Sequence, residues 1–391
     1  MAKVRLGDIA TVVTKGTTPT TMGFQFEDGG INFVKIESIS EDGTLLKEKF
    51  SHISDECNVQ MRRSQLQEND ILFSIAGAIG RSAIVTKEIL PANTNQALAI
   101  IRVPKGKIDY NYLLYALSSS AINQQATQHQ QGVAQLNISL KNVSDFLLPI
   151  YTEAMQKRIV HNLKKIDKLI SLRKQQLAKL DELIKARFVE MFGTFPANPF
   201  RWDTGKIQDV VSDVRYGSSR PAVEGGKYPY LRMNNITYSG ELDLRDTKRI
   251  DIPDSELDKC TVRRGDVLFN RTNSKELVGK TCVYNRDELM VLAGFVIRVR
   301  VNERIRPEVL SAFLNMDFSK RMLIGMCKTA IGQANINAKE LQNIDLYIPP
   351  IELQDQFVAL KNKIDQQKQT VQQSLEKLEL LKKALMQEYF G

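Results

Sequence analysis

The stretch EAMQKRIVHNLKKIDKLISLRKQQLAKLDELIKARFVEMFG, residues 153–193, decides the fold of this chain. Apolar residues recur in it at alternating spacings of four and three, and Lys, Asp, Glu and Gln fill the other faces, as in a coiled coil. No Pro or Gly interrupts the pattern before Gly193, a natural helix stop. The pattern predicts one long helix whose apolar stripe consists of Ile159, Leu163, Ile166, Ile170, Leu177, Leu180 and Ile184.

A second stretch of the same kind ends the chain. At one constant offset, Gln156 matches Gln354, Leu177 matches Leu375, and the pair Phe192-Gly193 recurs at the C-terminus. The second stripe is Phe357, Ile364, Val371, Leu375, Leu378 and Leu385. Because an isolated helix of this kind would leave its stripe in water, we expect the two helices to pack together as an antiparallel coiled coil. The alternative is two unrelated amphipathic helices that pack on separate cores.

The rest of the chain repeats at nearly the same offset. INFVKIESIS, from Ile31, matches YPYLRMNNIT, from Tyr228, and NDILFS, from Asn69, matches GDVLFN, from Gly265. Many such matches in one order indicate a tandem duplication. The predicted fold class is α+β: two mixed α/β domains separated by two long antiparallel helices, related by a pseudo-twofold axis. The predicted bounds are 1–151 for the first domain, 152–193 for the central helix, 194–350 for the second domain and 351–391 for the last helix.

Smaller elements follow from local patterns. We expect one amphipathic helix in each domain, over residues 110–124 and 307–322. The segment 193–202, GTFPANPFRW, contains turn formers and aromatic residues, which predicts a tight, packed connector between the two repeats. Trp202 is expected to pack there and not to stack on a base.

Composition limits the class of protein. A length of 391 residues suits two or more domains, and no run of eighteen apolar residues or signal peptide occurs, so we expect a cytoplasmic protein without a membrane partner. Four scattered cysteines and three isolated histidines predict neither a disulfide framework nor a metal site. A net charge of +9 favours a polyanionic partner, although charge alone does not distinguish DNA from RNA or a membrane surface.

Catalytic motifs are incomplete. Asn198-Pro199-Phe200 lacks the second proline of an adenine methyltransferase loop, and Gly279-Lys280-Thr281 lacks the first glycine of a phosphate-binding loop, where Ser274 stands. The histidines suggest no catalytic triad. We therefore predict a chain without catalytic residues or a cofactor of its own.

The plan of domain, helix, domain, helix, with a GD(I/V)LF-type strand in each repeat, resembles the specificity subunit of type I restriction–modification systems along essentially the whole chain. The resemblance implies two target recognition domains, each binding one half of an asymmetric bipartite sequence in double-stranded DNA. It also implies that the helices set the spacing and dock two methyltransferase subunits, with restriction/translocase subunits in the full complex. The partner subunits would use S-adenosylmethionine, ATP and Mg²⁺.

Base edges are read by Arg, Lys, Asn, Gln, Ser and Thr side chains held in loops. In the first domain the predicted DNA contacts are Lys15, Thr17, Thr18, Lys35, Ser74, Arg81, Gln131 and Gln135. In the second domain they are Arg215, Ser218, Arg220, Arg232, Asn234, Asn270, Arg271, Thr272, Asn273, Lys280, Gln333 and Asn335. Residues 270–273 directly follow a hydrophobic strand, which would hold their side chains firmly.

Two other functions stay open on the sequence alone. A fused restriction or modification enzyme would bind a cofactor by itself, against which the incomplete motifs argue. A coiled-coil adaptor that binds only protein would show no salt-dependent affinity for duplex DNA.

Overall fold

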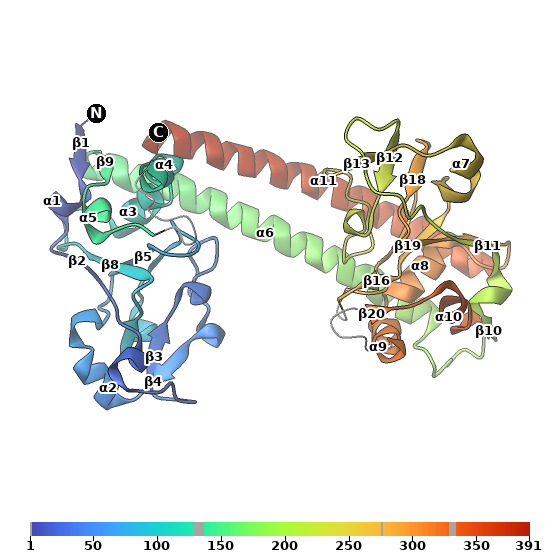
Figure 1. Cartoon of the computed structure of the whole chain (residues 1–391), viewed down its shortest axis with the longest axis horizontal. Coiled ribbons are helices and arrows are strands. Elements are labelled where there is room, and N and C mark those ends of the chain that lie inside the picture. Colours follow the sequence, from blue (N-terminus) through green and yellow to red (C-terminus); the bar gives the residue numbers. More distant parts are fainter. Residues whose placement is uncertain (1, 129–136, 275–276, 328–333) are drawn as a thin grey trace. The chain divides into compact units, whose positions relative to one another are not determined.

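The computed structural model describes residues 2–128, 137–274, 277–327 and 334–391 (Figure 1). The chain forms two compact units: unit 1 consists of Met1–Arg173 and Ser374–Gly391, and unit 2 of Lys174–Gln373. Each unit contains part of both long helices, α6 (Glu153–Phe192) and α11 (Ile351–Phe390). The predicted bounds, which set each helix apart from the domains, differ from this grouping because helical side chains pack inside the domain cores.

Unit 1 is built on a four-stranded antiparallel sheet in the order β2 (Val12–Lys15), β8 (Leu98–Arg102), β5 (Ile71–Ser74) and β6 (Ser82–Ile84). A three-stranded sheet adds β4 (Ser51–Ile53), β3 (Ile31–Val34) and β7 (Ala92–Thr94), and β1 (Ala2–Arg5) pairs with β9 (Leu147–Ile150). The shorter helices of unit 1 are α1 (Leu6–Ile9), α2 (Asp55–Gln60), α3 (Tyr110–Leu117), α4 (Ser120–Gln128) and α5 (Leu140–Ser144).

Unit 2 has a four-stranded antiparallel sheet in the order β11 (Val211–Tyr216), β19 (Val296–Val301), β15 (Val267–Asn270) and β17 (Thr281–Val283). A second sheet runs β13 (Lys248–Ile250), β12 (Tyr228–Leu231), β18 (Met290–Leu292) and β14 (Thr261–Val262). Two strand pairs complete the unit: β10 (Asp203–Lys206) with β21 (Asp345–Ile348), and β16 (Thr272–Asn273) with β20 (Ala334–Asn335). The shorter helices are α7 (Asp254–Cys260), α8 (Pro307–Asn315), α9 (Asp317–Met326) and α10 (Ala338–Gln342).

A glycine occupies the equivalent position at the four-stranded sheet of each unit. Gly16 follows β2 and Gly217 follows β11, the edge strands of the two four-stranded sheets. A Cβ at Gly16 would lie 1.7 Å from the Thr94 carbonyl oxygen, and one at Gly217 would lie 2.1 Å from the Leu292 oxygen. The two backbone segments can approach this closely only if the residue has no Cβ, which explains why both repeats have glycine here.

The two predicted apolar stripes, one on each long helix, are buried or half-buried along their whole length. Seven of its residues are buried: Ile159, Leu163, Ile166, Phe357, Ile364, Val371 and Leu375. The other six are half-buried: Ile170, Leu177, Leu180, Ile184, Leu378 and Leu385. Part of this burial comes from the domains, since Ile159 and Leu163 belong to the main core of unit 1 and Phe357 to that of unit 2.

Within each unit the two helical segments run in opposite directions. In unit 1 the Lys382 Nζ lies 2.6 Å from Asp167, and the Arg173 Nε donates to the Ser374 hydroxyl at 3.2 Å. A residue further along α6 thus pairs with a residue earlier in α11, so the two segments are antiparallel. In unit 2 the same holds, because the buried Lys368 pairs with Asp181 and the ring of Phe357 lies 5.6 Å from that of Phe188.

The two shorter amphipathic helices differ from their predicted form, because each is a pair of helices. The predicted helix 110–124 ends at Leu117, and α4 begins at Ser120, beyond Ser118 and Ser119. The predicted helix 307–322 breaks at Met316, whose backbone is extended with φ −68° and ψ 149°. Serine caps and turns compete with a helix interior, which accounts for the first break.

The connector between the repeats is tight, as predicted. The Asn198 side chain brackets Trp202, since its Oδ1 accepts from the Trp202 N–H at 2.9 Å and its Nδ2 donates to the Trp202 oxygen at 2.8 Å. The indole Nε1 of Trp202 donates to the Phe192 carbonyl at 3.1 Å. The Tyr347 hydroxyl donates to the Gly193 carbonyl at 2.7 Å, so the segment is fixed to β21.

Candidate nucleic-acid interface

Three of the four arginines predicted to contact DNA in unit 2 already have acidic partners. Each donates to a carboxylate of its own unit, in the pairs Arg215–Asp213 (2.8 Å), Arg220–Glu256 (2.6 Å) and Arg232–Asp246 (2.9 Å). The hydrogen bond from Arg220 lowers the pKa of Glu256 below its usual value. A DNA phosphate would have to compete with these carboxylates for the same N–H groups. The ion pairs therefore hold these three arginines in place within the protein.

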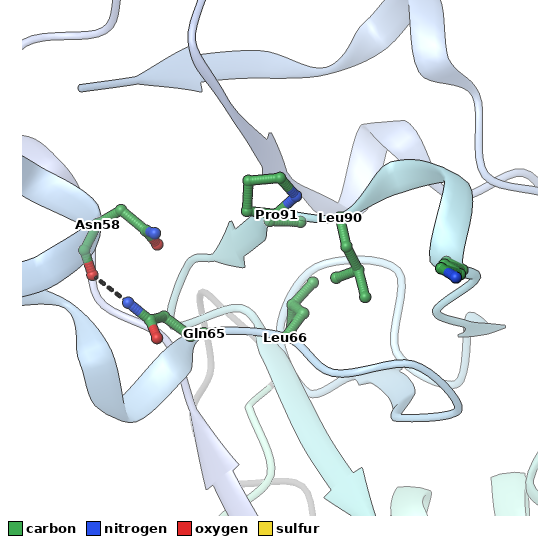
Figure 2. A pocket seen from close by; sticks show the side chains of 7 residues that line it. Asn58, Gln65, Leu66, Leu90 and Pro91 are labelled. Atoms are coloured by element: carbon green, nitrogen blue, oxygen red, sulfur yellow. Dashed lines mark hydrogen bonds between the residues drawn. The ribbon is translucent and has the colours of Figure 1, made fainter. Parts of the chain in front are cut away.

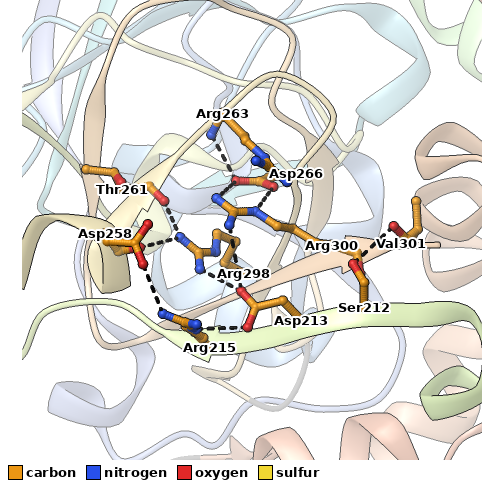
Figure 3. A network of polar contacts seen from close by, with 10 residues as sticks. All are labelled: Ser212, Asp213, Arg215, Asp258, Thr261, Arg263, Asp266, Arg298, Arg300 and Val301. Carbon is orange, nitrogen blue, oxygen red and sulfur yellow. Dashed lines mark hydrogen bonds and ion pairs between the residues drawn. The ribbon is translucent and has the colours of Figure 1, made fainter.

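A buried charge network lies behind Arg215, and no feature of the sequence singled it out (Figure 3). Arg298, only 1% exposed, donates to Asp213 at 2.7 Å and to the Thr261 carbonyl. Although burial of Asp213 raises its pKa, the hydrogen bonds from Arg298 and Arg215 leave the pKa below its usual value. In the equivalent strand of unit 1 the apolar Ile100 takes this place. The network is therefore specific to unit 2 and interior, and we assign it to the framework.

A second charge pair is common to both units and also escaped the sequence comparison. Arg102 donates through two nitrogens to Asp70, at 2.6 Å each, and Arg300 donates to Asp266 at 2.8 and 3.4 Å. Both aspartates are almost completely buried. The bond to Asp70 raises the pKa of Arg102. Asp70 lies just before β5 and Asp266 just before β15. Their recurrence in the Asn-Asp and Gly-Asp pairs of the two repeats was the only sequence feature that pointed to this ion pair.

The tetrapeptide 270–273 is held as firmly as predicted, but only part of it is accessible. Asn270 is completely buried, and its Nδ2 has no hydrogen-bond partner among the described residues. The buried Thr272 donates through its hydroxyl to Asn335 Oδ1 at 3.0 Å, and Asn273 Oδ1 accepts from the next backbone N–H at 2.8 Å. Asn335 itself is exposed. The remaining residue, Arg271, has its guanidinium over the ring of Tyr216, a tyrosine that we had not singled out.

Lys280 and Arg81 occupy equivalent positions, and the structure gives both a framework role. Lys280, 8% exposed, donates through Nζ to the carbonyls of Met233 and Ile236, and burial lowers its pKa. Arg81 donates to the Ile39 carbonyl at 3.2 Å. Each cation braces the turn after a short 3-10 helix. The expected contact of Lys280 with DNA is therefore not supported, because its ammonium group faces the interior.

The other predicted contacts of unit 1 fall into two groups. Ser74 is buried, donates to the Ala78 carbonyl and accepts from the Arg81 N–H, which are the bonds of a turn. Lys15 is exposed, whereas Thr17, Thr18 and Lys35 are half-buried. The Lys35 ammonium lies 4.1 Å from the centroid of the Phe26 ring, and Thr18 hydrogen bonds to Gln96.

Two further predicted residues of unit 2 differ in access. Ser218 is buried and accepts from the Arg220 N–H at 3.2 Å, whereas Asn234 is exposed. Gln131, Gln135 and Gln333 lie outside the described residues. The exposed predicted residues are thus Lys15 and Asn335, at the ends of β2 and β20, Arg220 in the loop after β11, and Asn234 after β12.

Unit 1 contains one further feature, a pocket (Figure 2). Its lining residues are Asn58, Gln65, Leu66, Lys87, Leu90, Pro91 and Ala92. Within this lining the Gln65 amide donates to the Asn58 carbonyl at 2.8 Å. None of the predicted DNA contacts lines it.

The part of the chain that the structure describes has neither a metal-binding cluster nor a membrane-spanning helix. That part holds no cluster of three or more His, Cys, Asp or Glu side chains placed to bind a metal ion. None of its helices combines the length and apolar character needed to span a bilayer.

Comparison with known proteins gives a family. The family described as type I restriction modification DNA specificity domain matches the chain twice, over residues 1–182 and 199–380. The Escherichia coli K12 type I restriction enzyme EcoKI specificity subunit is 21% identical over 321 residues, which cover 77% of this chain and 68% of that protein. A Methanocaldococcus jannaschii protein named as the MjaX specificity subunit is 26% identical over 196 residues. That match spans about half of each protein, 49% of this chain and 46% of the relative.

Solved structures agree in fold. The type I restriction-modification S subunit from M. genitalium has a TM-score of 0.53 at 14% identity, covering 100% of this chain and 96% of that one. A chain from a type I R-M system, studied for its assembly and conformational transition, has a TM-score of 0.60 at 19% identity and covers 100% and 97%. Because the family match extends over nearly the whole sequence and occurs once in each repeat, the resemblance seen in the sequence is confirmed: this chain belongs to the type I restriction modification DNA specificity family.

Proposed function

We propose that this chain is the non-catalytic sequence-specificity subunit of a type I restriction–modification complex. Each unit binds one half of an asymmetric bipartite target in double-stranded DNA. The observation that carries the proposal is that the two units share one framework and differ in the side chains exposed on it. The strand order of the four-stranded sheet, the glycine after its edge strand and the buried Asp–Arg pair recur, whereas the loop residues do not.

The domain arrangement belongs to the same proposal. Residues 1–151 and 194–350 are two target recognition domains, related by a pseudo-twofold axis through internal duplication. Residues 152–193 and 351–391 form an antiparallel coiled coil that sets the spacer between the half-sites. The ion pairs Asp167–Lys382 and Asp181–Lys368, each inside one unit, support this direction of the helices.

The helices also dock the partner subunits. Apolar side chains outside the stripe are exposed on both helices: Leu169, Leu172, Leu183, Leu380 and Leu381. Exposed apolar side chains on a helix favour a protein partner. Two methyltransferase subunits bind these exposed side chains of the helices and supply S-adenosylmethionine chemistry, and restriction/translocase subunits supply ATP- and Mg²⁺-dependent chemistry. A protein-only adaptor is the second candidate, because the same leucines would serve it.

Salt dependence distinguishes the two candidates. The target sequence is first obtained by mapping methylated adenines in cells that contain the chain with its methyltransferase subunit. Affinity of the purified complex for a duplex with that sequence is then measured by fluorescence anisotropy. With about 6–10 phosphate contacts, affinity falls by roughly 10³–10⁵ between 50 and 200 mM salt, because bound cations are released. A duplex of scrambled sequence serves as the control.

An adaptor that binds only protein gives a different result. The complex would then bind neither duplex above background at 50 mM salt, and no methylated bipartite sequence would depend on this chain. Equal affinity for the matched and scrambled duplexes would contradict the specificity role while leaving DNA binding intact.

A further inference from the structure

Arg271 has a backbone fixed on both sides. It lies between β15 and β16, its N–H donates to the Phe295 carbonyl at 3.1 Å, and its own carbonyl accepts from the Ile336 N–H at 2.9 Å. Its side chain therefore leaves the sheet edge from a defined point. A side chain with a fixed origin loses less conformational entropy when it binds a ligand.

The guanidinium of Arg271 also lies over an aromatic ring. Its central carbon lies 4.8 Å from the centroid of the Tyr216 ring. Tyr216 is in turn anchored, because its hydroxyl accepts from the Ala338 N–H at the start of α10 at 2.8 Å. Stacking on an aromatic face stabilises a guanidinium and fixes the direction of its N–H groups.

Among the residues that the structure describes, Arg271 differs from the other predicted arginines in having no acidic partner. Arg215, Arg220 and Arg232 each pair with a carboxylate, whereas no ion pair or hydrogen bond of the Arg271 guanidinium is found among the described residues. Its Nε is buried and has no hydrogen-bond partner within the described part of the chain. A cation with unused donors, beside exposed aromatic residues, is suited to a flat ligand with acceptor atoms.

Unit 1 has the same backbone geometry without this side chain. Ile75 is the equivalent residue, since its N–H donates to the Ala97 carbonyl at 2.9 Å and its carbonyl accepts from the Ile138 N–H at 3.0 Å. Ile75 is buried, and Lys15 and Ala97 stand where unit 2 has Tyr216 and the exposed Phe295. The framework therefore does not require arginine at this position.

We propose that Arg271 reads a guanine in the half-site bound by unit 2, and that Tyr216 is its positioning residue. This inference rests on the proposed function. Guanine presents O6 and N7 side by side in the major groove, and the two acceptors match the fork of an arginine. Unit 1 cannot make this contact at the equivalent position, so the contact contributes to the difference between the half-sites.

The surroundings favour a base edge over a phosphate. A phosphate contact needs only positive charge, which a lysine supplies as well. The Arg271 guanidinium instead lies over the ring of Tyr216, and its backbone N–H bonds to the carbonyl of Phe295; the two aromatic residues are 42% and 52% exposed. Apolar side chains contact base edges and thymine methyl groups in the groove, whereas phosphates attract polar groups.

The test maps methylated adenines made by the complex with the wild-type chain, Arg271→Lys and Arg271→Ala. Both variants are expected to lose one G·C requirement in the half-site of unit 2 and to keep the half-site of unit 1. Discrimination between G·C and A·T there falls roughly 5- to 150-fold, the range of one bidentate pair. Arg264→Gln is the matched control: it removes one cation of unit 2, which pairs with Asp287 at 2.8 Å, and leaves the motif unchanged.

Two outcomes overturn the inference. An unchanged motif with both variants shows that Arg271 reads no base. A motif kept by Arg271→Lys, with Arg271→Ala weakening binding equally at all sequences, assigns the residue to a phosphate. Folding is checked independently, because a misfolded variant would also lose the retained half-site and its thermal transition.

Tyr216 is tested by two further variants. Tyr216→Phe keeps the ring but loses the bond from the Ala338 N–H, so it is expected to keep the G·C requirement with smaller discrimination than the wild type, whereas Tyr216→Leu relaxes the same G·C position as Arg271→Ala. Relaxation at any other position contradicts the positioning role. The proposed function is judged separately, since it fails only if the wild-type chain directs no bipartite methylation.

Discussion

Replacement of Phe357 by alanine is expected to lower the free energy of unfolding of unit 2 by about 3–5 kcal/mol, the range for a buried phenylalanine. Phe357 is 1% exposed, and its ring lies 5.6 Å from that of Phe188 and 5.3 Å from that of Phe192. These rings join α11, α6 and the main core of unit 2. Removal of the central ring leaves a cavity that the fixed helices cannot close.

The measurement is hydrogen exchange of the amides of β15 and β19, which reports the stability of unit 2 separately from unit 1. Leu380→Ala is the control on the same helix, because Leu380 is 67% exposed and its truncation should change stability by less than about 0.5 kcal/mol. Equal effects of the two variants would show that the aromatic contacts do not hold the helices to unit 2.

Asp266→Ala is expected to destabilise unit 2 by a similar amount, about 3–5 kcal/mol, because it leaves a largely buried cation without its main partner. The Asp266 carboxylate accepts from Arg300 at 2.8 Å and from the Arg263 backbone N–H at 2.9 Å. Asp213 lies 3.9 Å from Arg300 and offsets only part of the loss. The same exchange measurement on β15 and β19 applies.

A double variant distinguishes the effect of an unpaired buried charge from the effect of losing the whole ion pair. Asp266→Leu with Arg300→Met removes both charges and should recover most of the stability lost in Asp266→Ala, since an apolar pair of similar volume often replaces a buried ion pair. Asp70→Ala is the matched variant of unit 1 and should destabilise that unit alone. If the double variant were as unstable as Asp266→Ala, the loss would not come from the unpaired arginine.

The long helices could be predicted from the sequence because their pattern is local. The stripe from Ile159 to Ile184 repeats at 3.5 residues, and Gly193 ends the pattern, so α6 ends within one residue of the prediction. The duplication was equally accessible, since it needs only matching segments. The grouping of the helix ends with the domain cores depends on contacts between distant residues, such as Phe188 with Phe357, which periodicity does not encode.

The candidate site was predictable only as a set of loops. Residue type could not distinguish Lys280, whose ammonium group caps buried carbonyls, from an exposed cation. It also could not show that Arg220 is paired with Glu256, thirty-six residues away in the chain, whereas Arg271 faces a tyrosine. The acidic partner of a cation is set by tertiary structure, and that partner decides which arginines have donors available.

The central claim, that each unit reads its own half-site independently, is tested most directly by replacing residues 1–151 with those of another family member. The exchange ends before α6 begins at Glu153, so both long helices are kept. Methylated adenines are then mapped in cells that contain the hybrid chain and the methyltransferase subunit. The account predicts a new first half-site with an unchanged second half-site and spacer. A hybrid that methylates the original sequence, or one in which both half-sites change, would contradict it.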